Sequence, residues 1–175
     1  MGLRCVKFIR DLQQPLRHII LVLAFGLGAM LIGFANRALP QGTAAIVDGR
    51  DLLVTIGAVL TGPLGGAVIG LLAGIPGSLP VVDIPAFIAG GFAAGLIARH
   101  CMSRSIWMPT AALGMGIGYL VEGALLVAFS LSGELPVLAF RTLFLLPIAI
   151  LVLSILFSGS DRVVAWIEKV YPKKV

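Results

Sequence analysis

Charged residues are scarce in this sequence. Only 13 basic and 8 acidic side chains occur among 175 residues, a charged share of 12%, about half of that in soluble domains. Apolar residues make up 59% of the chain, and its mean hydropathy is +1.07. This composition excludes a water-soluble globule. The length allows about six membrane helices of about 20 residues each, and it leaves no room for a kinase, nucleotide-binding or DNA-binding domain.

Cysteine is also scarce, and catalytic motifs are missing. Cys5 and Cys101 are both expected near one cytoplasmic face, which argues against a structural disulfide and leaves reduced or lipidated thiols. His18 and His100 have no Cys, His or carboxylate at metal-ligand spacing. The sequence has neither a serine nucleophile elbow nor a phosphate-binding loop, and no strand precedes the glycines that follow Gly114. We therefore expect no enzymatic activity, no cofactor and no metal site.

The net charge of +5 does not indicate nucleic acid binding, because the basic residues lie at the ends of apolar runs. That placement is typical of membrane topology signals and of contacts with anionic lipid headgroups. The expected partner is therefore the lipid bilayer, and no nucleic acid partner is expected.

The first 18 residues form a basic leader with four Lys or Arg residues. We expect a short interfacial helix that is interrupted at Pro15. The uncharged run from Ile19 to Ala35 follows, and its 17 residues just suffice for a membrane span. A cleaved signal peptide is the alternative, because Gly33 and Ala35 suit a cleavage site, although the leader is long and the apolar run exceeds the usual length.

The uncharged run from Leu52 to Val82 is too long for one membrane helix. Its 31 residues would form a helix of about 46 Å, whereas the hydrocarbon core of a bilayer is about 30 Å thick. The pair Gly62-Pro63 provides a break within the run. We expect two short helices or a re-entrant hairpin, near residues 45–61 and 64–76.

Three plainer apolar runs follow, at 84–98, 106–131 and 137–157, and an amphipathic basic tail covers 160–175. With a turn at Gly62-Pro63, ten of the 13 basic residues fall on one side of the membrane. Without it, the same groups split four against nine and the two ends of the chain lie on opposite sides. The positive-inside rule therefore favours an all-α, polytopic membrane bundle over 19–159, with six transmembrane segments and both termini cytoplasmic.

Small residues recur at a spacing of four in several of these runs, which lets helix backbones approach closely. Most of these pairs are expected to pack inside the bundle. The first helix is the expected exception, because a terminal helix has an exposed outer face. The residues predicted to pack against a partner helix are Ala24, Gly28, Ala29 and Gly33.

Two charges lie inside apolar runs. Glu122 is about nine residues from the outer end of its helix, and Arg141 is about five residues into the next helix from the same surface. A carboxylate inside a membrane is costly and usually faces a polar cavity or a partner group. The two side chains are placed where they could meet, either as a structural ion pair or as part of a ligand site, and both alternatives stay open.

Further polar residues collect at the same outer face, among them Asp83. Solvation of loops is the alternative explanation for most of them, with Arg50 at a helix entry as the exception. Together they describe a polar vestibule that suits a small polar ligand or an extracellular peptide. The ligand-binding candidates are Arg50, Asp48, Asp51, Glu122, Arg141 and Asn36.

The stretch that starts at Asp48-Gly49-Arg50-Asp51, breaks at Gly62-Pro63 and continues through Gly70 to Gly74 resembles the membrane receptor domain of the LytS/YhcK type, nominally called five-transmembrane. The resemblance covers about residues 36–99. Family members often have a His-Arg pair shortly after the Gly-rich helix, where this sequence has Pro76-Gly77-Ser78. The family implies a sensor of the cell envelope in phosphorelay signalling, usually fused to a kinase or cyclic-dinucleotide output domain.

A second resemblance is architectural. Substrate-binding S components of energy-coupling-factor transporters are similar in size, have six helices with cytoplasmic termini, and use small residues of the first helix to dock a coupling subunit. The expected protein is thus a multi-pass protein of the bacterial inner membrane that takes a small polar ligand from the outer face. Its protein partner is either a signalling output or a coupling subunit with ATPases. A purely structural or assembly factor is the third class.

Overall fold

All regular elements in the described part of the chain are helices. The computed structural model describes residues 2–38, 49–101 and 110–158, with the side chains before Leu16 and some later ones excepted. In chain order the elements are α1 (Gly2–Arg37), α2 (Arg50–Gly74), α3 (Pro80–Cys101), α4 (Leu113–Ala128), the 3-10 turn η2 (Ser132–Glu134), α5 (Leu135–Phe140), the π-helical η3 (Arg141–Leu145) and α6 (Leu146–Ser158). No strand occurs among these residues.

Among the described residues, four helices are long and apolar enough to cross a membrane by length and composition: Leu16–Arg37, Arg50–Gly74, Pro80–His100 and Thr110–Ala128. Large apolar side chains face outward on them, and only 17% of the apolar window of the first lies buried inside the bundle. Water would oppose such a surface, whereas lipid tails solvate it. The all-α prediction is confirmed, and the chain has the features of a membrane protein.

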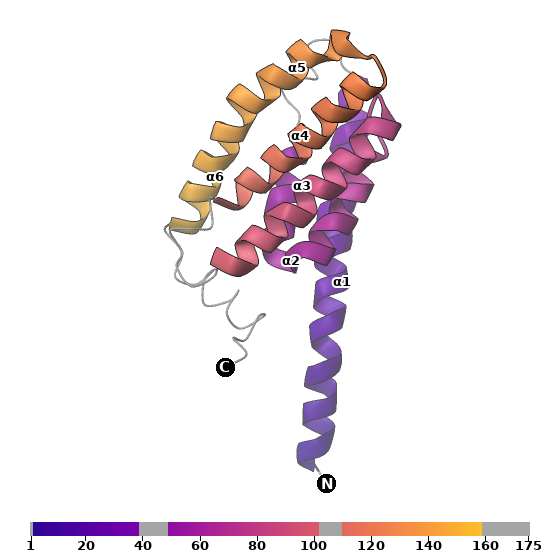
Figure 1. The fold of residues 1–175 in the computed structure, drawn as a ribbon. Helices are drawn as coiled ribbons and strands as arrows, with labels where there is room; N and C mark the ends of the chain where they lie inside the picture. Colours follow the sequence, from indigo (N-terminus) through magenta and orange to yellow (C-terminus); the bar gives the residue numbers. More distant parts are fainter. Residues whose placement is uncertain (1, 39–48, 102–109, 159–175) are drawn as a thin grey trace.

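Helix α1 is continuous over its 36 residues, so the expected interruption at Pro15 is wrong. Proline removes one backbone hydrogen bond and crowds the preceding turn, but a long helix that continues on both sides can retain its course. Figure 1 shows that the first half of α1 projects beyond the lower end of the bundle. The basic leader is therefore helical in continuity with the apolar run that follows it.

Helix α2 folds back on itself at Gly62. This residue has φ 76° and ψ −173°, a backbone region that is essentially restricted to glycine. Arg50 Nη1 donates to the Ala73 carbonyl oxygen over 3.1 Å, although the two residues are 23 positions apart and a straight helix would separate them by about 35 Å. The break predicted at Gly62-Pro63 is thus confirmed, and α2 consists of two antiparallel arms, 50–61 and 63–74.

Each arm has about 12 residues and a length of about 18 Å, which is well short of a hydrocarbon core of about 30 Å. With 25 residues, α2 is long enough for a membrane span. Because the chain reverses at Gly62, neither arm alone is long enough to cross a bilayer. The geometry is that of a helical hairpin, and its irregular backbone at Gly62 is buried in protein.

Backbone contacts without intervening side chains hold the hairpin to α3. A methyl group added at Gly66 would lie 2.3 Å from the Gly91 carbonyl oxygen, and one at Gly70 would lie 2.1 Å from the Phe87 carbonyl oxygen. The contact between α3 and α4 has the same character, because a methyl group at Gly114 would lie 2.1 Å from the Ala94 nitrogen. The four-residue spacing of small residues therefore serves packing within the bundle.

The chain runs up and down between two ends of the bundle (Figure 1). Helix α1 rises to the upper end, where α2 begins and ends, and its turn at Gly62 points to the lower end. Helix α3 descends and α4 rises beside it. The segment from α5 through η3 to α6 descends along α4, with Leu138 near Gly123 and Leu146 near Gly116. The start of α1 and the end of α6 thus lie toward the same end.

Replacing Gly91 with Ala is expected to destabilise the fold. The added methyl group would lie 2.2 Å from the Gly66 carbonyl oxygen, so one helix backbone must move, and overpacking of this kind costs about 1–3 kcal/mol. Gly116→Ala is the matched control, because its methyl group would first meet Leu146 Cδ2 at 3.8 Å. Unfolding midpoints in detergent measure the difference. A midpoint for Gly91→Ala equal to that of the control would contradict the tight contact.

Candidate functional site

Four charged side chains are buried at the upper end of the bundle. Arg50, Asp51, Asp83 and Glu122 are between 4% and 8% exposed. They come from three helices, α2, α3 and α4. Charges removed from water are tolerated only when hydrogen bonds and opposite charges compensate them. This cluster, here called the upper polar cluster, includes three of the predicted ligand-binding candidates, Arg50, Asp51 and Glu122.

Arg50 lies where α1, both arms of α2 and α3 meet. Its Nη1 donates to the Ala73 carbonyl oxygen at 3.1 Å, and its Cζ lies 4.9 Å from the centre of the Phe87 ring. Gly33 of α1 leaves room for its aliphatic part, since a methyl group there would lie 3.1 Å from Arg50 Cδ. A guanidinium that stacks on an aromatic face and donates to a carbonyl is held in one orientation. Its planar donor fork is the type of group that binds carboxylates and phosphates.

Asp51 connects the hairpin to α4. Tyr119 Oη donates to Asp51 Oδ2 at 2.6 Å, and both side chains are buried. A hydrogen bond of this length to a carboxylate is a strong, charge-assisted one. Tyr119 was not among the residues predicted from the sequence. Its position three residues before Glu122 was the available signal, because that spacing places a polar aromatic tip on the same helix face as the buried carboxylate.

Glu122 lies one turn beyond Tyr119 on the face of α4 that packs against α3. Gly118 brings α4 close at this level, since a methyl group there would lie 2.7 Å from the Ala86 carbonyl oxygen. The carboxylate is 8% exposed. The upper polar cluster thus combines one guanidinium, a tyrosine hydroxyl and carboxylates from several helices, a set that can bind a small polar molecule bearing both donors and acceptors.

A second group of contacts closes the loop between α2 and α3. Arg37 Nη2 donates to the Gly77 carbonyl oxygen, and Asp83 Oδ2 accepts a hydrogen bond from the Leu79 N–H at 3.2 Å. A side chain at position 77 would collide with Asp83, because its first carbon would lie 1.8 Å from Asp83 Oδ2. Asn36 is half-buried at the end of α1. These residues fix the rim of the cluster.

The side chains of two predicted candidates are not among those that the structure describes. Asp48 lies outside the described residues, and so does the side chain of Arg141. The backbone of Arg141 begins the π-helical segment η3, which was not predicted from the sequence. Such segments are rare and frequently occur at functional sites. Whether Arg141 pairs with Glu122 stays a prediction. No group of three or more His, Cys, Asp or Glu side chains that could hold a metal ion occurs among the residues described.

Two of the four residues of the first helix that are predicted to pack against a partner helix lie inside the bundle, and partner packing itself stays a prediction. Ala29 is fully buried in the protein's own core, and Gly33 is covered by Pro76 and Arg50. Gly28 is half-buried and faces Leu53, which leaves Ala24 as the exposed member. Four-residue spacing identifies a face of close packing but does not tell whether the neighbour is internal. The outer face of α1 instead carries Leu16, Ile19, Ile20, Leu23, Leu27, Leu31 and Phe34.

Comparison with family models, with curated proteins and with solved structures found no match to this chain.

Replacing Tyr119 with Phe is expected to destabilise the protein by about 1–3 kcal/mol, because it leaves a buried acceptor on Asp51 without this donor. The measurement is a double-mutant cycle in detergent with Asp51→Asn, which reads the coupling between the two side chains from unfolding free energies. We expect the double variant to lose less than the sum of the two single variants. Strict additivity would show that the hydrogen bond carries no stability.

Proposed function

We propose that this protein is a membrane-embedded receptor domain that binds a small polar ligand at the upper polar cluster. The observation that supports the proposal is the burial of Arg50, Asp51 and Glu122, with Asp51 hydrogen-bonded to Tyr119. Ionisable groups at membrane depth are costly, and in membrane proteins they mark ligand sites and ion paths by default. A bundle whose only need was packing would be served better by apolar side chains of the same volume.

The membrane topology we propose follows from the fold and the charges. Helices α1, α3 and α4 and the segment from α5 to α6 each cross the bilayer, and the α2 hairpin enters from the outer side, which makes six segments in all. Both termini then lie in the cytoplasm, and the positive-inside bias of the sequence supports that orientation. The upper polar cluster faces the outside. The proposed location is the bacterial inner membrane.

The resemblance to the LytS/YhcK receptor domain supports the sensory role. Its motif begins at Arg50-Asp51 and breaks at Gly62-Pro63, and these are the residues that supply buried polar groups and reverse the chain. The proposed role is a receptor for the cell envelope whose output is a separate partner protein. The S-component alternative has weaker support, because Ala29 and Gly33 already pack inside the bundle.

Signalling requires that the ligand bind one arrangement of helices better than another. In the proposed mechanism, a ligand that contacts Arg50 and Glu122 joins α2 to α4, two elements already linked through Asp51 and Tyr119. Contacts made in one arrangement only would shift the hairpin relative to α4, and the helix ends on the cytoplasmic side would carry that shift to the partner.

Replacing Glu122 with Gln is expected to weaken the binding of a co-purified ligand by about tenfold or more, the scale set by one charge-assisted hydrogen bond. Native mass spectrometry of the gently extracted protein measures the fraction that carries a bound mass. Glu134→Gln is the control, because Glu134 is an exposed acid near the same end. Equal occupancy in the Glu122 and Glu134 variants would contradict the site, and the absence of any bound molecule would favour a structural role.

The topology is tested by reporter fusions. A fluorescent protein that folds only in the cytoplasm is expected to be bright after Cys101 and dark after Gly77, and periplasmic alkaline phosphatase should show the opposite pattern. The reason is that α3 runs from the outer to the cytoplasmic side when α2 is a hairpin. If α2 were one complete span, each fusion would give the inverse signal.

A further inference from the structure

A cavity lies beneath the turn of the α2 hairpin, at the end of the bundle opposite the upper polar cluster. Its volume is about 210 Å³, and its walls come from α1, the turn of α2 and the last turns of α3. The residues that matter for its chemistry are His18, Thr61, Gly62, Pro63, Leu64 and Arg99. None of them belongs to the upper polar cluster, so the chemistry of this cavity is independent of the function proposed for that cluster.

The cavity follows from the short arms of the hairpin. From Arg37 to His18, α1 extends over about 28 Å, whereas each arm of α2 covers about 18 Å. The turn at Gly62 therefore lies above the level that α1 reaches at His18. Gly95 allows α3 to approach the hairpin turn closely. A methyl group at Gly95 would lie 2.5 Å from the Gly62 carbonyl carbon. Arg99 lies one turn further down α3, below the turn.

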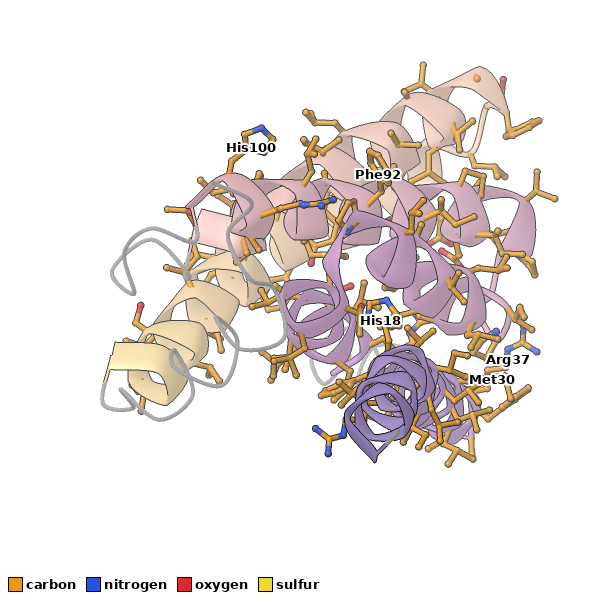
Figure 2. All side chains as sticks on the ribbon, turned by 90° about the horizontal axis from the view of Figure 1, so that it is seen from below. His18, Met30, Arg37, Phe92 and His100 are labelled. Carbon is orange, nitrogen blue, oxygen red and sulfur yellow. The ribbon has the colours of Figure 1, made fainter. Side chains whose placement is uncertain are left out.

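The charge at this cavity is positive. Arg99 and His18 line it from opposite sides, and no acidic side chain is among the lining residues that the structure describes. The first arm ends at Thr61 and the second begins at Pro63, so opposite ends of two helix dipoles meet at the cavity, and its positive charge comes from side chains. Figure 2, seen from the lower end, shows His18 on the side of α1 that faces the other helices.

The rim of the cavity is apolar and faces outward. Leu64 is 76% exposed, the most exposed large apolar side chain of α2, and it lies next to Pro63 at the turn. A volume of about 210 Å³ is below the range of about 300–1,000 Å³ for drug-sized ligands and is suited to a compact headgroup. An arginine and a histidine are side chains that can donate hydrogen bonds to the oxygens of a phosphate.

We propose that this cavity binds a phosphate group, with Arg99 and His18 on its oxygens and Leu64 beside it in contact with lipid. The phosphate of an anionic lipid reaches the cavity from the cytoplasmic leaflet, where its acyl chains lie along the exposed leucine. A free phosphate or a phosphorylated small molecule reaches the same groups from the cytoplasm. Occupation of the cavity fills the space under the hairpin turn and supports it from below.

The test titrates the full-length protein, delipidated in a non-ionic detergent, with phosphatidylglycerol and with phosphatidylcholine, and reads bound lipid by native mass spectrometry. We expect phosphatidylglycerol to bind more tightly. The double variant Arg99→Gln with His18→Gln should weaken it by about tenfold, the scale of one charge-assisted contact. In a second arm, inorganic phosphate is added to the same protein and its binding is followed by the broadening of its ³¹P resonance.

The control is the double variant Arg17→Gln with His100→Gln. It makes the same change of residue types one position away on each helix, at exposed side chains outside the cavity. Figure 2 shows His100 on the far side of α3 from α1. Equal unfolding midpoints of the two double variants verify that both are folded. If the double cavity variant does not fold, the single variants Arg99→Gln and His18→Gln are measured by the same binding experiments.

Loss of phosphatidylglycerol binding in the cavity variant alone supports a lipid site. Loss of inorganic phosphate binding in that variant alone, without any lipid preference, supports a site for a soluble phosphate. Equal losses in the cavity and control variants would show a diffuse attraction to the basic surface and would overturn the proposal. Binding of neither probe, or equal binding of the two lipids with no phosphate binding, would also overturn it.

Discussion

The reversal of the chain at Gly62 is the constraint on which the rest of the structure depends. A positive φ combined with ψ near 180° is available to glycine and costs other residues about 1–3 kcal/mol. Because the chain turns here, Arg50 lies beside Ala73 instead of about 35 Å away. The reversal also presents the small residues of the second arm to α3. Both the tight packing of the bundle and the grouping of its charges follow from this one backbone conformation.

The upper polar cluster shows how a short hairpin gathers charge in an apolar bundle. Arg50 and Asp51 are adjacent in sequence, so at the start of a helix they project about 100° apart and reach different neighbours. Arg50 contacts Phe87 of α3, whereas Asp51 accepts from Tyr119 of α4. One dipeptide therefore joins the hairpin to two further helices, and the burial that makes these groups costly also makes their hydrogen bonds strong.

Much of this arrangement could be predicted from the sequence, because the relevant signals are local. The length of the run around Gly62-Pro63 required a break. Its position inside an apolar run made Glu122 a candidate, and the expected collection of polar residues at the outer face made Arg50 and Asp51 candidates. The sequence did not show in which direction individual side chains point. Spacing alone did not tell that Ala29 and Gly33 face the protein's own core, and Tyr119 looked like an ordinary aromatic residue because its partner lies 68 positions away. Nor does an apolar run reveal a π-helical segment at Arg141.

The hairpin connects the two ends of the bundle. Its open end holds Arg50 and Asp51, and its turn forms the roof of the lower cavity. Each arm is a helix of about 18 Å, and the second arm packs by direct backbone contact on α3, so that contact does not absorb displacement in the way that flexible side chains would. A small tilt of the open end would therefore move the turn as well. Under both proposals together, a ligand at the upper polar cluster and a phosphate beneath the turn act on the same element, and each would alter the affinity for the other by an equal factor.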